Sequence, residues 1–166
     1  MAKRPLKTWV VVADSSRARF FRPDLEAAKL APAGLADLVA PQSRQRPRDL
    51  KSDKPGRSFS SSRGGMRHAF EPPHDYHKLE KHRFMTVLAT ALDEAYGRRD
   101  FDDLILVLPR RSLGELRGML SKGVQGRIRE EIAKDLAAEP ASRLWRRLGP
   151  LLGEQVPARR RSLSRP

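Results

Sequence analysis

The chain has 166 residues, which is enough for one ordinary domain and short for two. It contains no cysteine, so disulfides, thiolate catalysis and thiolate metal sites are excluded. The 34 lysines and arginines outnumber the 20 acidic residues, and the net charge of +14 predicts attraction to polyanions: RNA, DNA or an anionic membrane surface.

The N-terminal residues 1–6 form a short basic extension. The apolar run that follows, Trp9 to Ala13, is too short for the hydrophobic region of a signal peptide. No stretch approaches the length of a transmembrane helix. We therefore expect a cytoplasmic protein that is at most peripheral to a membrane and has no integral membrane association.

Three short strands are predicted in the first quarter of the chain. Residues 8–14, TWVVVAD, are rich in β-branched side chains and lead into an Asp-Ser-Ser turn, which predicts a buried strand. Residues 17–23, RARFFRP, suit a second strand that closes a hairpin. The mixed segment LEAAKLAPAG carries no assignment, and 35–41, LADLVAP, predicts a short third strand stopped by Pro41.

A long basic loop is predicted over residues 42–74. Between 42 and 67 it carries eight basic residues against Asp49 and Asp53, and its apolar residues follow no period. Loops of this length are uncommon inside a compact domain and are usually functional or disordered. The basic residues are Arg44, Arg46, Arg48, Lys51, Lys54, Arg57, Arg63 and Arg67.

Two adjacent glycines stand in the centre of this loop, in SSSRGGMRHAF at 60–70. Gly64 and Gly65 allow positive φ and close approach of a partner to the main chain, and Arg63 and Arg67 beside them suit a phosphate-bearing partner. The stretch by itself is more typical of a flexible solvated loop than of a binding site. The Pro-Gly turn in SDKPGRSF, at 52–59, fits either a phosphate contact or a plain turn.

A long helix and a buried strand follow the loop. Apolar residues recur at three- and four-residue steps across 76–99, which predicts an amphipathic helix with Asp75 as its cap and Gly97 at its end. The strand at 101–111 contains a continuous apolar run, Leu104 to Leu108, of the kind found in strands that are covered on both faces.

The last third of the chain predicts two further helices and one ambiguous element. Residues 112–123 predict a helix capped by Ser112, with Glu115 in the capping-box position and Gly123 at the end. In 127–140 the apolar residues are spaced by four, which satisfies both a helix and a strand. Residues 141–152 predict a short amphipathic helix, and 153–166 a disordered basic tail.

These elements predict one α/β domain over residues 7–152. Its central sheet is mixed, with an N-terminal hairpin and further strands, and helices flank it. A helix that leads into a fully buried strand favours a sheet that is at least partly parallel. The long basic loop lies before the longest helix.

The candidates for catalysis and metal binding carry little specificity. Four histidines, at 68, 74, 77 and 82, lie beside Asp75 and Glu80, but their spacing matches no zinc pattern. The serines of the loop lack the surroundings of a nucleophile elbow. Asp14 ends a strand, where sites often form, but the Asp-Ser-Ser turn explains it equally well. No catalytic residue, metal, cofactor or small-molecule substrate is indicated.

Aromatic residues make up 6 % of the chain, and Phe59 alone lies in the basic part of the loop. This argues against stacking of single-stranded bases. It favours recognition of structured RNA through its backbone and shape.

Several motifs occur in an order that resembles a known family. WVVVADSSRARFF, SDKPGRSF with the Gly-Gly loop, HKLEKHRFMTVLATALDEA, FDDLILVLPRRSLGELRGML and IAKDL together resemble the bacterial host attachment proteins, over residues 7–148. That family is in turn similar to the middle domain of archaeo-eukaryotic peptide-chain release factors and to Pelota-like rescue factors. The resemblance implies a release-factor-like fold and favours a strand at 127–136.

In those release factors the loop before the long helix carries Gly-Gly-Gln, reaches the ribosomal peptidyl-transferase centre and promotes hydrolysis of peptidyl-tRNA. The matching residues here are Gly64, Gly65 and Met66, so methionine stands in place of the glutamine. Glutamine offers a side-chain amide that can order water, and methionine offers only a weak sulfur acceptor. The resemblance therefore implies RNA binding by the two glycines and the backbone of Met66.

We expect an RNA-binding protein of the translation machinery that associates with ribosomal RNA or tRNA. Two alternatives stay open: a peptidyl-tRNA hydrolase in ribosome rescue, and a factor that acts indirectly in attachment to host cells. The expected RNA-binding residues are Arg44, Arg46, Arg48, Lys51, Lys54, Arg57, Arg63, Gly64, Gly65, Met66, Arg67 and His68.

Overall fold

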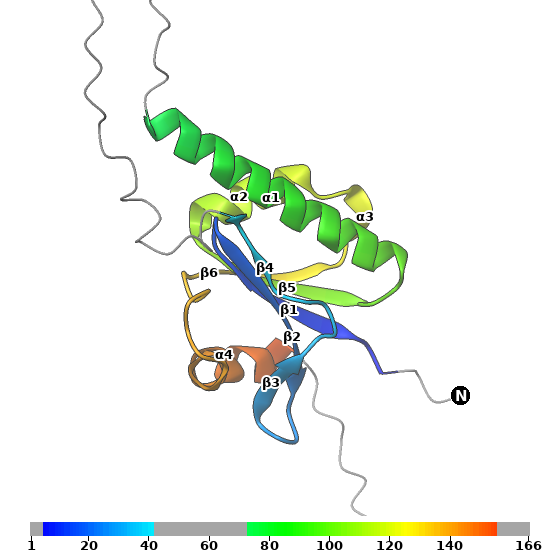
Figure 1. Ribbon diagram of the computed structural model, residues 1–166. Helices are drawn as coiled ribbons and strands as arrows, with labels where there is room; N and C mark the ends of the chain where they lie inside the picture. Colours follow the sequence, from blue (N-terminus) through cyan, green and yellow to red (C-terminus); the bar gives the residue numbers. More distant parts are fainter. Residues whose placement is uncertain (1–4, 42–72, 156–166) are drawn as a thin grey trace, which may run out of the picture.

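A computed structural model describes residues 5–41 and 73–155. In these residues the strands and helices form a three-layer α/β arrangement (Figure 1). The strands are β1 (Thr8–Ala13), β2 (Arg17–Asp24), β3 (Lys29–Pro32), β4 (Leu38–Val39), β5 (Asp103–Leu108) and β6 (Ile128–Ala133). The helices are α1 (Pro73–Gly97), α2 (Arg110–Met119), α3 (Lys122–Gln125) and α4 (Ala141–Gln155).

The strands form one mixed sheet in the order β3-β2-β1-β5-β6, and β4 pairs with β2 beside β3. β1 and β2 form the expected antiparallel hairpin, in which Val11 pairs with Phe20. β5 lies parallel to β1 on one side and parallel to β6 on the other. The expectation of a mixed, partly parallel sheet is therefore confirmed.

Helices cover both faces of the sheet. α1, α2 and α3 lie on one face and α4 lies on the other (Figure 1). Under α1, Val11 and Phe20 pack with Met85, Leu88 and Leu92. On the opposite face the remaining β1 and β5 side chains pack against the apolar stripe of α4, which consists of Leu144, Leu148 and Leu152.

β5 is a strand that is enclosed on both faces. Every residue from Leu104 to Leu108 is fully buried, which confirms the prediction of a strand covered on both faces. The ambiguous segment forms β6, because Ile128 to Ala133 find hydrogen-bonding partners along β5. The glutamates and alanines of this segment have the propensity of a helix, and pairing with the neighbouring strand outweighs that propensity.

Three predicted helix boundaries are wrong. α1 begins at Pro73, so Asp75 lies inside its first turn, and proline at the first helical position is itself a start signal. α2 begins at Arg110, directly after Pro109, and Ser112 is a buried residue inside its first turn rather than the cap. Gly123 lies in α3, because α2 has already ended at Met119.

Two strands differ from the expectation. β3 forms in the mixed segment that carried no assignment, after a turn in which Asp24 Oδ1 accepts a hydrogen bond from the amide of Ala27 at 2.9 Å. The strand expected over 35–41 is reduced to Leu38 and Val39. α4 runs to Gln155, three residues into the segment expected to be a tail, and residues 156–166 lie outside the described residues.

No helix in the described ranges is long and apolar enough to cross a membrane.

Candidate nucleic-acid interface

The carboxyl ends of three parallel strands meet at one edge of the sheet. β1 ends at Ala13, β5 at Leu108 and β6 at Ala133, and their parallel pairing places these residues side by side. We call this the carboxyl edge. In open α/β sheets ligands bind outside the carboxyl ends of the strands, so this edge is the first place to look for a site.

The β1–β2 turn at the carboxyl edge is built around Asp14. Its Oδ1 accepts hydrogen bonds from the Ser16 amide at 2.6 Å, the Ser16 hydroxyl at 2.8 Å and the Arg17 amide at 2.9 Å. These bonds use the aspartate as a turn former. Of the two explanations that the sequence left open for Asp14, the turn accounts for its contacts.

Positive side chains gather at this edge. Arg110 and Arg111 are exposed in the first turn of α2, Lys134 is exposed directly after β6, and Arg17 is half-buried where β2 begins. Within the described ranges none of these four cations lies within 4 Å of a carboxylate. The first turn of α2 has no acidic residue, so the positive end of the helix dipole adds to their field.

Cations farther along the same elements are neutralised. Arg117 of α2 hydrogen-bonds to Glu131 of β6, with its Nε 3.0 Å from Oε1. That hydrogen bond, together with the attraction between the two charges, raises the pKa of the Arg117 guanidinium. Arg129 lies 3.1 Å from Asp103. The carboxyl edge is therefore positive because its own cations lack such partners.

Both flanks of the segment 42–72 lie at the carboxyl edge. The amide of Ala40 donates to the carbonyl of Ser16 at 2.7 Å, which places the end of β4 against the β1–β2 turn. On the other flank α1 runs alongside α2 in the same direction, since His82 contacts Glu115 at 3.0 Å and Thr86 contacts Met119 at 3.8 Å.

Both of these contacts join residues 33 apart in the sequence. The same offset places the first turns of α1, with exposed His77 and Lys78, level with the start of α2. Figure 1 shows the start of α1 and the ends of β1, β4 and β6 on the same side of the molecule. The predicted basic loop is therefore attached on both sides to an edge that is itself positive.

A hollow of about 470 Å³ lies between β4 and α1 beside these attachment points. Its apolar lining includes Leu38 and Pro41 from one side and Phe84 and Val87 from the other. Its charged residues are compensated in part, because Arg83 lies 3.0 Å from Glu80. It is an apolar surface next to the positive edge.

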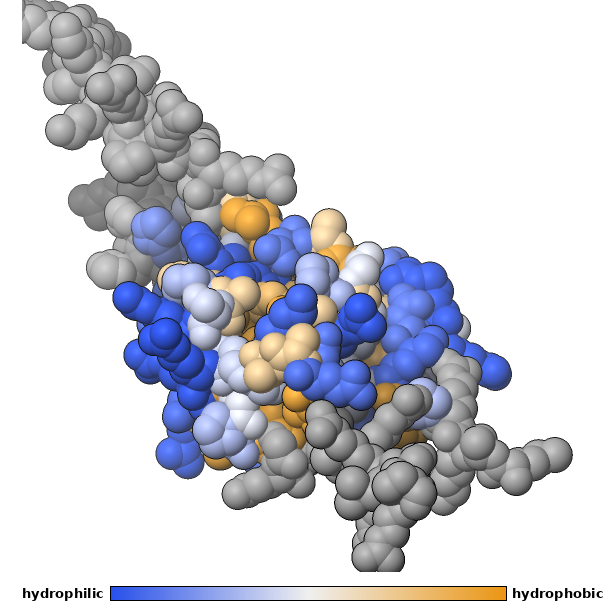
Figure 2. Space-filling model, turned by 90° about the horizontal axis from the view of Figure 1, so that it is seen from below, coloured by the Kyte–Doolittle hydropathy of each residue, from blue (hydrophilic) through white to orange (hydrophobic). Residues whose placement is uncertain are grey.

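More arginines lie around the edge on the α4 side. A guanidinium N–H of Arg19 donates to the backbone carbonyl of Glu139, and Arg143 and Arg147 lie 3.8 and 3.7 Å from the two carboxylate oxygens of that residue. Glu139 thus faces three arginines, and within the described chain its Oε2 is buried with no hydrogen-bond partner. Figure 2 looks onto this side and shows that hydrophilic side chains cover much of it.

The twelve residues predicted to bind RNA all lie between 42 and 72, outside the described residues. Of the predicted histidine cluster, His77 is exposed and His82 is paired with Glu115. The described residues contain no group of three or more side chains arranged to hold a metal ion. Sequence reasoning did not single out Arg17, Arg110, Arg111 and Lys134, although the position of three of them just after a strand was a usable signal.

The fold and its edge define a class: a three-layer α/β protein with a mixed sheet and a basic carboxyl edge. The family model described as "Protein required for attachment to host cells" matches residues 9–148, and the chain belongs to this family. Among curated proteins none matches the chain. The resemblance to host attachment proteins expected from the motifs is therefore confirmed.

The turn at Asp14 generates a prediction about stability. Asp14→Ala removes the acceptor of three hydrogen bonds and should lower the free energy of unfolding by about 1–3 kcal/mol. Asp14→Asn keeps an oxygen in the same position and should lower it by less. Urea unfolding measures both values. Equal stability of wild type and Asp14→Ala would show that the turn does not depend on this side chain.

Proposed function

We propose that this protein binds structured RNA of the translation machinery, ribosomal RNA or tRNA, through a surface formed by the carboxyl edge and the segment 42–72. The observation that carries the proposal is the set of unneutralised cations at the edge where both flanks of that segment are attached. The sequence of the segment holds eight further basic residues. Phosphate contacts by lysine and arginine supply most of the affinity of such surfaces.

The chemistry of the edge supports contact with the RNA backbone more than with its bases. Arginine donates in a fork that matches phosphate oxygens, and backbone contacts position a protein on RNA without reading sequence. Among the described residues Tyr76 is the one strongly exposed aromatic side chain, 54 % exposed in the first turns of α1. One ring does not make a stacking platform, which supports recognition of folded RNA by shape.

The Gly64-Gly65-Met66 sequence supports a binding role for the segment. In the release factors that the motifs resemble, the matching loop also precedes the long helix. Two glycines allow close approach to RNA, and Met66 supplies no side-chain amide to order an attacking water. The proposed function is therefore binding, and hydrolysis of peptidyl-tRNA is the alternative that this methionine disfavours.

The family description concerns attachment to host cells. An RNA-binding role in the cytoplasm makes any effect of this protein on attachment indirect, through the synthesis of other proteins. We expect the native protein to sediment with ribosomal particles in a sucrose gradient. Detection of the protein on the outer surface of intact cells, with none on ribosomes, would overturn this location.

The edge cations give a direct test of the binding surface. Arg110→Ala with Arg111→Ala should weaken binding of unfractionated tRNA by about tenfold or more and reduce the slope of log K against log salt by about one to two units. Filter binding at several salt concentrations measures both quantities. The matched control is Lys29→Ala with Lys122→Ala, which removes the same charge from exposed residues at the opposite end of the sheet.

The control should retain most of the affinity. If the two double variants bind tRNA equally weakly, binding follows net charge alone and the carboxyl edge is not a site. If the wild-type protein itself binds no structured RNA at physiological salt, the proposed function is wrong.

The glycines of the segment give a second, independent test. Gly64→Ala with Gly65→Ala should weaken association with RNA or ribosomes and leave the melting temperature nearly unchanged, because the added Cβ atoms obstruct close approach. Arg63→Ala with Arg67→Ala should weaken binding and flatten its salt dependence by about one unit for each phosphate group that the variant no longer neutralises. A double-glycine variant that binds like wild type would identify the segment as a solvated linker.

A further inference from the structure

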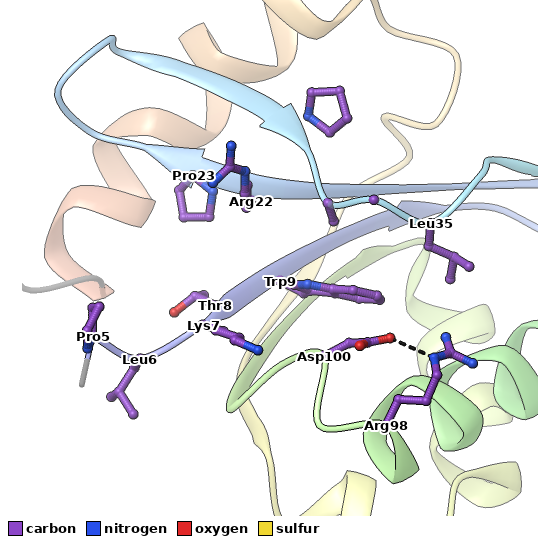
Figure 3. Close-up of a pocket in the computed structure, with 13 residues that line it drawn as sticks. Pro5, Leu6, Lys7, Thr8, Trp9, Arg22, Pro23, Leu35, Arg98 and Asp100 are labelled. Carbon is purple, nitrogen blue, oxygen red and sulfur yellow. Dashed lines mark hydrogen bonds and ion pairs between the residues drawn. The ribbon is translucent and has the colours of Figure 1, made fainter.

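A cavity of about 850 Å³ lies at the end of the sheet opposite to the carboxyl edge. It is formed where β1 begins, β2 ends and the turns after β3 and α1 meet (Figure 3). Pro23, Pro32 and Leu35 give it apolar walls. Its volume falls within the range of sites for small organic molecules.

Two residues of the cavity wall, Trp9 and Thr8, carry a polar side-chain group with no hydrogen bond to the described residues. Trp9 is 4 % exposed and packs against Phe20 and Phe101, with ring centroids 5.9 and 5.3 Å away. No hydrogen bond within the described chain involves its indole N–H, nor the hydroxyl of neighbouring Thr8, which is 6 % exposed. Neither group is a buried atom without a partner, since among the described residues Glu139 Oε2 alone is one. Both groups are therefore accessible from the cavity, and an acceptor atom of a ligand can bind there in place of water.

The charges of the cavity favour an anion. Arg22 projects from the end of β2, and no carboxylate of the described residues lies within 4 Å of it. The Lys7 ammonium donates to the carbonyl of Arg99 at 3.2 Å, which is a neutral partner. The one carboxylate of the lining, Asp100, is bound to Arg98 at 2.9 Å (Figure 3). Within the described chain, two cations therefore stand without a compensating carboxylate.

We propose that this cavity binds a small organic anion. Its carboxylate or phosphate group faces Arg22 and Lys7, and its apolar part lies against Pro23, Pro32 and Leu35. An acceptor atom of the ligand satisfies the indole N–H of Trp9. This site is independent of RNA binding, because it lies at the other end of the sheet and the Trp9 ring is too buried to stack on a base.

The indole N–H of Trp9 provides the readout. The chain has two tryptophans, and Trp145→Phe assigns the Trp9 signal in a ¹H–¹⁵N spectrum of the full-length protein. The probes are hexanoate, phenyl phosphate, inorganic phosphate and, as the neutral control, hexanol. We expect hexanoate or phenyl phosphate to shift the Trp9 signal saturably, and comparison of the two identifies the preferred head group.

Arg22→Ala should weaken that binding by about tenfold or more, since it removes the cation expected to face the anion. Lys7→Gln should do the same while keeping the backbone amide that donates to Asp102. Lys29→Ala, a nearby charge outside the lining, should bind like wild type. The rest of the spectrum shows whether each variant is folded.

Three results would overturn the proposal. The first is no shift of the Trp9 signal with either organic anion up to about 10 mM, a concentration that would reveal even millimolar affinity. The second is an equal shift with hexanol, which would make the cavity a nonspecific apolar surface. The third is wild-type affinity in both the Arg22 and Lys7 variants. These three results do not depend on whether the carboxyl-edge variants lose RNA binding, so the two proposals are tested separately.

Discussion

The burial of β5 on both faces is the constraint on which the rest of the structure depends. The run from Leu104 to Leu108 exposes no side chain, so both faces of the strand must be covered and both of its edges paired. Parallel pairing on each side requires the chain to cross back over a face of the sheet between strands. α1 makes that crossing before β5, and α2 and α3 make it after.

These crossings determine which strand ends and helix starts lie together at the carboxyl edge. They bring the ends of β1, β5 and β6 to one edge and the starts of α1 and α2 to the same edge. The segment 42–72 joins β4 to α1, so both of its flanks are attached there as well. A long basic insertion at this place adds to an edge whose own cations, among the described residues, lack carboxylate partners. Some cations farther from the edge are paired, as Arg117 is with Glu131 and Arg129 with Asp103.

The strongly periodic and the strongly apolar segments could be predicted from the sequence, and the elements that depend on a distant partner could not. Apolar residues at three- and four-residue steps, as in α1, indicate an amphipathic helix. A continuous apolar run such as Leu104–Leu108 indicates a strand that is covered on both faces. β3 has no pattern of its own and exists because β2 offers an edge to pair with. Ser112 and Glu115 have the spacing of a capping box, which predicts a helix that begins at Ser112. The helix begins two residues earlier, at Arg110, directly after Pro109 and the end of β5.

The candidate site also has one part that could be predicted from the local sequence and one part that depends on the fold. The basic segment and its glycines could be read from composition, since charge and turn residues are local properties. Arg17, Arg110 and Lys134 come from three separate stretches, and only the strand order brings them to one edge. The cavity at the other end is likewise formed by four distant stretches, and no local pattern marks it.

The two ends of the sheet are suited to different anions because they differ in shape as well as charge. The carboxyl edge spreads exposed cations over a broad surface, which suits a polyanion that contacts many of them at once. The opposite end brings two exposed cations, the indole N–H of Trp9 and apolar walls to one cavity, which suits a small molecule with one charged group. Binding to a polyanion releases many counterions and weakens steeply with salt, whereas binding of a ligand with one charged group releases few and depends less on salt. The excess of positive charge is common to both proposals, and the arrangement of neighbours around each cation distinguishes the polyanion proposed for one end from the small anion proposed for the other.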